Sequence, residues 1–375
     1  MKALILVGGY GTRLRPLTEA VPKPLVPFAN KAIILHQIES LALVGVKDVV
    51  LAVSYMADKM IQEMKQYENA YGVRIRFSLE DEQLGTAGPL ALARSMLTET
   101  PGPFFVLNSD VICNYPFAEM AEFHASHGKE GTIVVTDVED PSKYGVVVCE
   151  DESTQIKSFV EKPKVFVSRK INAGLYLFNQ SVLDRVPDVR DMSIEKEVFP
   201  FAAADGQLHG FPLEGFWMDV GQPRDYLAAI PLYMKNITER RRKGLQLAVL
   251  DHEHEHNPAH YAGSRTGNII VHPGTKVGKG SLLGPNVFIG ENVTIGANVR
   301  IQNSAVFDGA KIHSGVSVAD SIVGWNSSLE SGCVVKNISV LGENVVLKEN
   351  VTVDGGRVSS NSVVSADLPQ TTPIC

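Results

Sequence analysis

A glycine-rich turn near the start of the chain carries residue types that bind polyphosphates. Gly8, Gly9 and Gly11 follow a short apolar run, and Thr12 and Arg13 come next. Glycines let the backbone approach a polyanion closely and point several N–H groups at it. An open α/β sheet places its ligands where a strand passes into such a loop. The turn therefore predicts a phosphate-binding site.

A second cation follows the turn. Lys23 stands between Pro22 and Pro24, and the two prolines restrict the backbone that presents its ammonium group. With Arg13, it favours a nucleoside triphosphate as the ligand. A Walker loop is excluded because its lysine is missing, and a dinucleotide fingerprint is excluded because Leu14 stands where the third glycine belongs. The remaining alternative is a tight turn with two surface cations.

Two aspartates follow apolar runs and are candidates for a metal site. Asp110 comes after the run at 104–107, so its carboxylate is expected at the carboxyl edge of a sheet, and Asp219 follows Trp217. A carboxylate in apolar surroundings needs a counter-charge. Magnesium is typically bound by one or two carboxylates and by phosphate oxygens. Each aspartate alone could be an N-cap or turn residue, but the pair predicts Mg²⁺ beside the triphosphate.

Several further motifs occur in a recognisable order. They are GGYGTRLRPLT at 8–18, PKPL at 22–25, LGTAGPLALA at 84–93, FVLNSD at 105–110, FVEKP at 159–163, INAG at 171–174 and FWMDVG at 216–221. Together they resemble the signature of the sugar-1-phosphate nucleotidylyltransferases, in particular the GDP-mannose pyrophosphorylase branch. The resemblance spans residues 1 to about 235.

The resemblance implies a reaction. Mannose 1-phosphate and GTP would give GDP-mannose and pyrophosphate, by in-line attack of a sugar-phosphate oxygen on the α-phosphorus. A phosphate monoester is largely dianionic at neutral pH and needs no general base. Catalysis would then consist of positioning and charge neutralisation by Arg13, Lys23, Lys162 and Mg²⁺.

The resemblance also implies the substrate contacts. Lys162 would contact the sugar phosphate and the α-phosphate, although a surface pair with Glu161 is the simpler reading of those two residues alone. Asn172 offers an amide that both donates and accepts hydrogen bonds. The implied nucleoside contacts are Leu6, Gly85 and Asn108. The full implied set is Leu6, Gly8, Gly9, Gly11, Thr12, Gly85, Asn108, Asp110, Gly145, Glu161, Asn172 and Gly174.

The elements that must place these residues alternate between strand and helix patterns. This alternation predicts an α/β domain over residues 1–235, with a Rossmann-like, mostly parallel sheet and crossover helices. The predicted strands are 3–7, 49–53, 73–77 and 104–107, and the predicted helices are 31–44 and 89–97.

A repeat of six residues begins near Ile269. Glycines follow the repeated aliphatic residues and are expected to relax the backbone at the corners. The spacing predicts a triangular parallel coil, with three short strands a turn and one inward side chain a strand. The family resemblance implies a left-handed β-helix, which we place at residues 268–375. The two aliphatic series, separated by a slip, are Val271, Val277, Leu283, Ile289, Ile295 and Ile301, then Val323, Leu329, Val335, Leu341, Leu347 and Val353.

A polar stretch, residues 236–267, separates the two regions and is predicted to be a linker. His252, His254 and His256 within it would face one side of an extended chain. A solvated loop is favoured over a metal site because no second ligand cluster accompanies them.

Composition narrows the function classes. The 375 residues carry a net charge of −7, which opposes a nucleic-acid-binding surface. No apolar run reaches the roughly 18 residues of a membrane helix, and the run after Lys2 is too short for a signal peptide. The four cysteines form no CxxC pair, so a reducing, cytoplasmic location is expected.

Three alternative functions remain open, and the chain is expected to assemble into an oligomer. The same chemistry could use UTP, dTTP or ATP with glucose 1-phosphate. A silent nucleotide-sugar-sensing subunit would be expected to lack the charged site residues that are present here. An acyltransferase would need a histidine such as His272 or His313, but a solvated turn is the simpler role for each. The coil is expected to support a homo-oligomer, with a paralogous regulatory subunit as another candidate partner.

Overall fold

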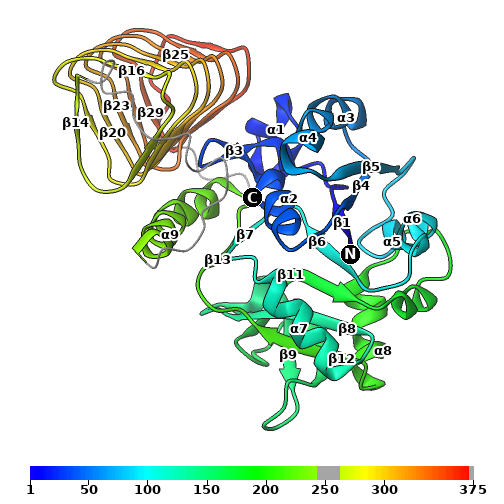
Figure 1. Cartoon of the computed structure of the whole chain (residues 1–375). Coiled ribbons are helices and arrows are strands. Elements are labelled where there is room, and N and C mark those ends of the chain that lie inside the picture. The colour runs from blue at the N-terminus through cyan, green and yellow to red at the C-terminus, as the bar shows by residue number, and fades with distance from the viewer. Residues whose placement is uncertain (243–261, 371–375) are drawn as a thin grey trace. The chain divides into compact units, whose positions relative to one another are not determined.

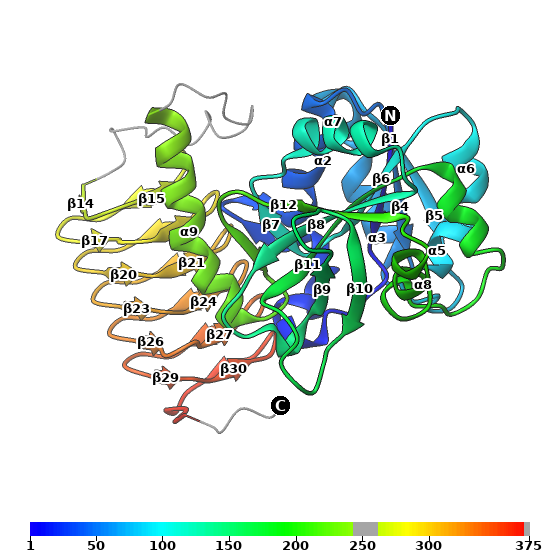
Figure 2. The same cartoon turned by 90° about the horizontal axis from the view of Figure 1, so that it is seen from below.

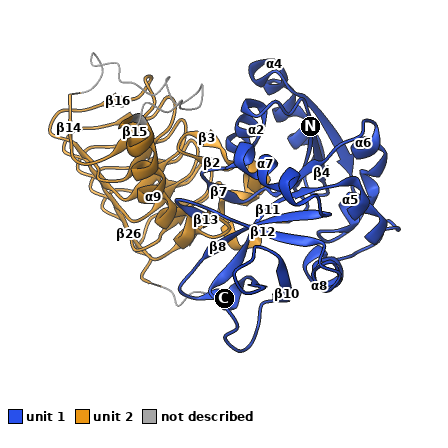
Figure 3. Cartoon of the chain, turned by 60° about the horizontal axis from the view of Figure 1, so that its bottom comes forward, with its two compact units in different colours: residues 1–9, 34–217 blue, residues 10–33, 218–375 orange. Residues whose placement is uncertain are grey.

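The computed structural model describes residues 1–242 and 262–370. These form two compact units, which are coloured separately in Figure 3. Unit 1 comprises Met1–Gly9 and Ile34–Trp217, and unit 2 comprises Tyr10–Ile33 and Met218–Cys375. The predicted boundaries at residues 235 and 267 stay predictions. His252, His254 and His256 lie outside the described residues.

Unit 1 is built on a nine-stranded mixed sheet (Figure 1). Its strands are β1 (Lys2–Leu6), β4 (Asp48–Val53), β5 (Arg74–Leu79), β6 (Phe104–Asn108), β8 (Gly131–Asp137), β9 (Gly145–Cys149), β10 (Ile156–Glu161), β11 (Lys170–Phe178) and β12 (Leu208–Pro212). In one half, β1 pairs in parallel with β4 and β6, and β4 pairs in parallel with β5. In the other half, β11 is antiparallel to β6, β8 and β9. The predicted α/β fold is confirmed, with an antiparallel extension that the sequence patterns did not indicate.

Strands β1, β4 and β6 of the parallel half are largely apolar and the edge strand β5 alternates, because the sheet is covered by helices. The helices are α2 (Ile33–Leu43), α3 (Ala57–Lys65), α4 (Tyr67–Tyr71), α5 (Gly88–Leu92), α6 (Arg94–Thr98), α7 (Phe117–His127) and α8 (Phe199–Ala204). The predicted helix 31–44 begins at Ile33, because Lys31–Ala32 forms strand β3. The predicted helix 89–97 is two short helices, since Ala93 leaves the helical region with φ −83° and ψ 3°.

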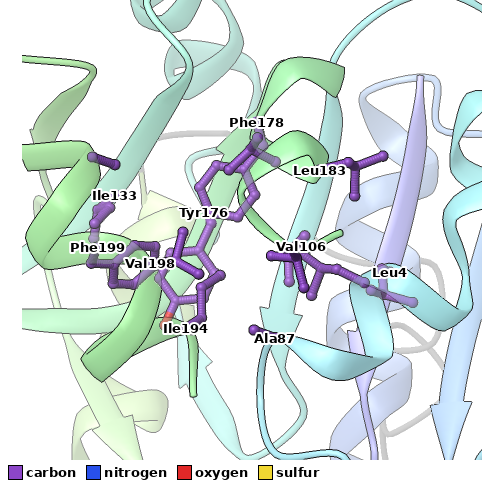
Figure 4. Close-up of a cluster of buried hydrophobic side chains, with 14 of the residues drawn as sticks. Leu4, Ala87, Val106, Ile133, Tyr176, Phe178, Leu183, Ile194, Val198 and Phe199 are labelled. Atoms are coloured by element: carbon purple, nitrogen blue, oxygen red, sulfur yellow. The ribbon is translucent and has the colours of Figure 1, made fainter. Parts of the chain in front are cut away.

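The core of unit 1 lies between the sheet and these helices. Figure 4 shows Tyr176 and Phe178 of β11 beside Phe199 of α8 and Ile194. The rings of Tyr176 and Phe178 stack with centroids 5.6 Å apart, and Tyr176 and Phe199 lie 5.2 Å apart. All four residues are completely buried, so the centre of the unit is an aromatic cluster with well-defined packing.

Three histidines gather at one side of unit 1. The hydroxyl of the buried Thr132 is 2.9 Å from His124 Nδ1 and 2.8 Å from His127 Nε2. The rings of His127 and His209 stack with centroids 4.3 Å apart. Burial, and then the imidazole of His209, lower the pKa of His127 to about 4. Burial likewise lowers the pKa of His124 and His209, so the folded protein favours neutral rings.

We therefore expect unit 1 to lose stability in mild acid. An unfolded histidine has a pKa near 6.5, so below about pH 6.5 the unfolded chain binds more protons than the folded one. Stability should fall as the pH decreases from about 6.5 to about 4, with a contribution on the order of 1 to 2 kcal/mol from His127, because this partly buried ring is partly screened by solvent. Urea midpoints followed by circular dichroism test this. His127→Gln should flatten the pH dependence and His313→Gln should not; equal pH dependence in the wild type and His127→Gln would contradict it.

Unit 2 contains three parallel six-stranded sheets, stacked coil on coil (Figure 2). The first is β14 (Ser264–Arg265), β17 (Leu282–Leu283), β20 (Arg300–Gln302), β23 (Ser317–Ala319), β26 (Val334–Lys336) and β29 (Thr352–Asp354). The second is β15 (Ile269–Val271), β18 (Val287–Ile289), β21 (Ser304–Val306), β24 (Ile322–Val323), β27 (Val340–Leu341) and β30 (Arg357–Val358). The third is β16 (Lys276–Val277), β19 (Thr294–Ile295), β22 (Lys311–Ile312), β25 (Ser328–Leu329), β28 (Val346–Leu347) and β31 (Val363–Val364). The arrangement is consistent with the predicted left-handed β-helix.

The two predicted aliphatic series form the core of these coils. Every member of both is buried. The slip between them has a structural cause: Ile269 pairs with Val287, but Val287 pairs with Ser304 and Ala305 pairs with Ile322, so two successive turns are each one residue shorter. Inward stacking continues through the slip because Val306, which is fully buried, pairs with Val323.

Glycine is needed at these repeat positions for a different reason from the one predicted. Among Gly278, Gly284, Gly290 and Gly296, only Gly284 has a left-handed backbone, with φ 103°. At Gly278 a side-chain carbon would lie 2.5 Å from the backbone of Gly296 in the next coil. Close stacking therefore explains these positions better than relaxed corners do, because a left-handed backbone is instead taken at many asparagines.

The segment Tyr10–Ile33 is attached to the β-helix within unit 2. It contains α1 (Leu17–Ala20), β2 (Pro27–Phe28) and β3 (Lys31–Ala32), and it packs beside α9 (Pro223–Arg242). The ring of Phe28 lies 5.2 Å from that of Tyr226 on α9 and 5.3 Å from that of Phe288 on β18. Asn30 donates a 2.7 Å hydrogen bond to the Ile289 carbonyl. The second part of the predicted phosphate turn, from Tyr10 onwards, therefore belongs to a segment that packs closely against α9 and the β-helix.

In the part of the chain described, no helix has both the length and the hydropathy needed to span a membrane.

Candidate functional site

Four parallel strands of unit 1 end at one edge of the sheet, and candidate ligand groups follow them. Leu6, at the end of β1, pairs with Asn108 of β6 and with Ala52 of β4. Gly8, Asp110 and Glu80 therefore emerge at the same edge, after β1, β6 and β5. The hydroxyl of Ser54, which follows β4, donates a 2.8 Å hydrogen bond to the Gly8 carbonyl. This is the edge at which open α/β sheets bind ligands.

Glu80 is the most unusual group at this edge, and the sequence patterns did not indicate it. The residue is 7% exposed, and its Oε1 is buried with no hydrogen-bond partner. Its Oε2 accepts a 3.3 Å hydrogen bond from the Leu84 amide, and a side-chain carbon at Gly8 would lie 3.5 Å from Oε2. Burial raises the pKa of this carboxyl. An acceptor left unsatisfied in this way is costly unless a ligand supplies a donor.

A second group of predicted residues lies around β9, β10 and β11. Lys162, directly after β10, has a left-handed backbone with φ 44°, which is unusual for a lysine. Its ammonium group lies 3.2 Å from Glu161 Oε1, and its side chain is 64% exposed. Glu161 Oε2 would lie 2.9 Å from a side-chain carbon at Gly145. Gly145 therefore lies beside Glu161, next to Lys162 in the chain, and the substrate contacts of these three residues stay predictions.

The amide of Asn172 is fixed at both ends. Its Nδ2 donates a 2.8 Å hydrogen bond to the Tyr176 hydroxyl, and its Oδ1 accepts a 2.9 Å hydrogen bond from the Gly174 amide. One N–H and one lone pair remain for a ligand. Gly174 has φ 75°, and a side-chain carbon there would lie 2.7 Å from Asn108 Nδ2. A glycine is therefore required where Asn172 and Asn108 come together.

Two aromatic residues border this group. The indole N–H of Trp217 donates a 2.9 Å hydrogen bond to the Ala173 carbonyl, and the ring of Tyr144 lies edge-on to the indole with centroids 5.4 Å apart. Such rings provide flat apolar walls of the kind that bind the faces of sugars and bases. Trp217 was not among the predicted site residues, although it stands in the FWMDVG motif.

In unit 2, two cations and one carboxylate converge on Gly221. A side-chain carbon at Gly221 would lie 2.6 Å from Asp219 Oδ1, 2.9 Å from Lys23 Nζ and 3.1 Å from the Arg13 guanidinium. Asp219 Oδ1 also accepts a 2.8 Å hydrogen bond from the Gly221 amide. The structure therefore brings Arg13, Lys23 and the Asp219 carboxylate together at this glycine. The cluster suits a polyanion.

The donor set suits magnesium. Among the described residues, no three His, Cys, Asp or Glu side chains form a metal-binding group. Magnesium at phosphoryl-transfer sites is typically held by one or two carboxylates, with phosphate oxygens and water completing its shell. The hard oxygens of Asp110 and Asp219 fit that requirement. Asp110 belongs to unit 1 and Asp219 to unit 2, so their binding of one ion stays a prediction.

The remaining predicted residues lie at the strand edge, in the loop after Glu80, or in unit 2 next to Arg13. Leu6, Gly8, Gly9, Asn108 and Asp110 are at the strand edge. Gly85 is in the loop after Glu80, and Gly11 and Thr12 precede Arg13 in unit 2. The hydroxyl of Thr18 donates a 2.8 Å hydrogen bond to the Gly11 carbonyl, which stabilises the glycine-rich turn.

Comparisons with known proteins cover almost the whole chain. The Nucleotidyl transferase family matches residues 2–236, and the GMPPB C-terminal domain matches residues 265–374. The chain is 54% identical over 370 residues to the mannose-1-phosphate guanylyltransferase catalytic subunit beta of Xenopus tropicalis, covering 99% of each chain. It is 54% identical over 369 residues to the mannose-1-phosphate guanyltransferase of Schizosaccharomyces pombe, covering 98% of each.

A solved structure resembles the first part of the chain. HddC from Yersinia pseudotuberculosis, complexed with GMP-PN, matches with 27% identity and a TM-score of 0.50. The match covers 61% of this chain and 97% of that one.

Proposed function

The chain belongs to the nucleotidyl transferase family, within the mannose-1-phosphate guanylyltransferases, and from this membership we propose that it converts GTP and mannose 1-phosphate into GDP-mannose and pyrophosphate. The relatives named above carry this activity in their names. The charged residues Arg13, Lys23, Asp110, Lys162 and Asp219 are all present, which opposes a silent sensing subunit.

The observation that carries the choice of base is the carboxyl group of Glu80. Guanine presents two adjacent donors, N1–H and the N2 amino group, to a carboxylate that accepts two hydrogen bonds. Uracil and thymine present one N–H between two carbonyl oxygens, which a carboxylate repels. The unsatisfied Oε1 of Glu80, at the strand edge beside Gly8, supports guanine as the base that binds there.

The reaction follows from charge and position. A phosphate oxygen of mannose 1-phosphate forms a bond to the α-phosphorus of GTP, and the bond from that phosphorus to the bridging oxygen breaks, so that its electron pair leaves with pyrophosphate. Lys162 would neutralise the attacking and attacked phosphates, and Arg13 and Lys23 would stabilise the leaving pyrophosphate. Glu161 and Asn172 would orient the sugar. Magnesium, held by Asp110 and Asp219, would add positive charge to the phosphate oxygens.

Identification of the products tests the proposal. Incubation with GTP labelled at the α-phosphate, mannose 1-phosphate and Mg²⁺ should yield labelled GDP-mannose and pyrophosphate in equal amounts. Omission of mannose 1-phosphate should abolish pyrophosphate release. Release of pyrophosphate without the sugar phosphate, or labelled product only with glucose 1-phosphate, would contradict it.

Exchange of one atom at Glu80 should change the choice of base. In Glu80→Gln, an amide N–H₂ replaces one acceptor and meets the donors of guanine, so kcat/KM for GTP should fall by about 10- to 100-fold. The value for UTP should not fall and should rise by no more than about threefold, because the repulsion of its carbonyl oxygens is only partly removed. Steady-state pyrophosphate release measures both. The exposed neighbour Glu82 provides the control Glu82→Gln, and an unchanged ratio of GTP to UTP would refute the assignment.

Two further parts of the proposal concern the cellular location of the enzyme and its assembly. The cysteines among the described residues, Cys113, Cys149 and Cys333, are free thiols, which supports a reducing, cytoplasmic location. Self-association through the β-helix, or with a paralogous subunit, stays a prediction.

A further inference from the structure

The loop that follows Glu80 is hydrogen-bonded to a segment far along the chain. The hydroxyl of Thr86 donates a 2.6 Å hydrogen bond to Glu195 Oε2 and accepts a 2.9 Å hydrogen bond from the Ile194 amide. The hydroxyl of Ser193 donates a 2.8 Å hydrogen bond to the same carboxylate oxygen. One carboxylate thus collects two hydroxyl donors, and hydrogen bonds to an ionised acceptor are stronger than neutral ones.

The backbones of the two segments are joined as well. The Met192 carbonyl accepts hydrogen bonds from the Thr86 amide at 3.1 Å and the Ala87 amide at 2.8 Å, and the Met192 amide donates to the Leu84 carbonyl at 3.2 Å. Gly85 has φ 69°, and a side-chain carbon there would lie 2.5 Å from the Met192 carbonyl oxygen. The loop therefore has little room to shift relative to Met192.

This attachment rests on the core of unit 1. Ile194 begins a π-helical turn, Ile194–Val198, and packs near Tyr176 in the aromatic cluster, with Ala87 below them in Figure 4. Ala87 and Ile194 are completely buried, and Met192 is 6% exposed. The segment that holds the loop is thus supported from behind by close-packed side chains, which transmit small displacements.

We propose that Glu195 is a positioning residue for the nucleotide: its carboxylate, through Thr86, holds the loop around Gly85 where the nucleoside binds. This positioning role rests on the proposed function only in placing the nucleoside beside Gly85. Glu195 itself would not contact a substrate. Its loss would loosen Gly85 and the Leu84 amide that bonds Glu80, and would thereby weaken nucleotide binding more than sugar-phosphate binding.

The test separates the two substrates. In Glu195→Ala, KM for GTP should rise about 10-fold, while kcat and KM for mannose 1-phosphate should stay within about twofold of the wild type. Glu195→Gln should restore most of the loss, because an amide oxygen still accepts from both hydroxyls. Thr86→Val should behave like Glu195→Ala, and Thr86→Ser like the wild type. These variants also decide the question if Glu195→Ala does not fold.

A control excludes a general loss of stability. Glu130 pairs with Arg185 at 2.6 Å in unit 1, and neither residue takes part in the hydrogen bonds that hold this loop. Glu130→Ala should lower the melting temperature and leave KM for GTP unchanged. An unchanged KM for GTP in Glu195→Ala and Thr86→Val, or an equal rise for both substrates, would overturn the positioning role. Failure of the proposed function is distinct, because it would appear in the wild type as no GTP-dependent pyrophosphate release.

Discussion

Replacement of Lys162 by alanine should lower kcat by about 10²- to 10³-fold, which is the loss typical of removing one charge-stabilising donor. The ammonium group would face both reacting phosphates, where two anions repel each other most. Its side chain is 64% exposed and its carboxylate neighbour, Glu161, is 3.2 Å away. The fold should therefore survive, since exposed ion pairs contribute little to stability. Steady-state pyrophosphate release and far-ultraviolet circular dichroism measure the two effects.

Lys164 is the matched control for this change. It is exposed and lies two residues further along the same connection, so Lys164→Ala should keep nearly normal turnover. Lys162→Arg keeps the charge but spreads it over a larger planar group, and we expect an intermediate rate. A Lys162→Ala enzyme with near-normal kcat and an unchanged spectrum would remove Lys162 from the reaction.

Replacement of Asp219 by alanine should have an effect of similar size, about 10²- to 10³-fold in kcat. Two causes add: a magnesium ligand is lost, and Arg13 and Lys23 lose the carboxylate that lies with them at Gly221. The concentration of Mg²⁺ that gives half-maximal rate should also rise. Magnesium titrations of the steady-state rate, made at saturating GTP, measure both changes.

The variant Asp219→Asn separates charge from structure. An asparagine oxygen can still accept the hydrogen bond from the Gly221 amide, but it carries no charge. Turnover should therefore fall nearly as far as in Asp219→Ala, with the fold better preserved. Asp225→Asn, on helix α9 of the same unit, should leave the magnesium titration unchanged. A normal magnesium titration in Asp219→Asn would contradict a metal-binding role.

The repeats could be read from the sequence because most strands of the β-helix contribute a buried aliphatic residue at a regular spacing. The parallel strands β1, β4 and β6 could also be read from the sequence because they are largely apolar, and β5 could be read from its alternation. The antiparallel strands could not. Pairing of β11 with β6 and β8 depends on contacts between distant segments, and no local pattern encodes them.

The site was only partly predictable for a related reason. Glu80 begins the acidic run Glu80 to Glu82, which reads as a solvated surface until its burial is known. Glu195 lies in a similarly charged stretch, and only the fold brings it to Thr86. The attachment of Tyr10–Ile33 to the β-helix unit was also hidden, because residues close in sequence were expected to belong to one domain.

The choice of nucleotide tests the central claim most directly. Initial rates of pyrophosphate release should be measured with mannose 1-phosphate, Mg²⁺ and each of GTP, ATP, UTP and dTTP. The orientation of Glu80 predicts that kcat/KM for GTP exceeds that for each of the others by at least about 10-fold. Equal or greater values for UTP or dTTP would contradict both the guanine-binding role of Glu80 and the proposed reaction.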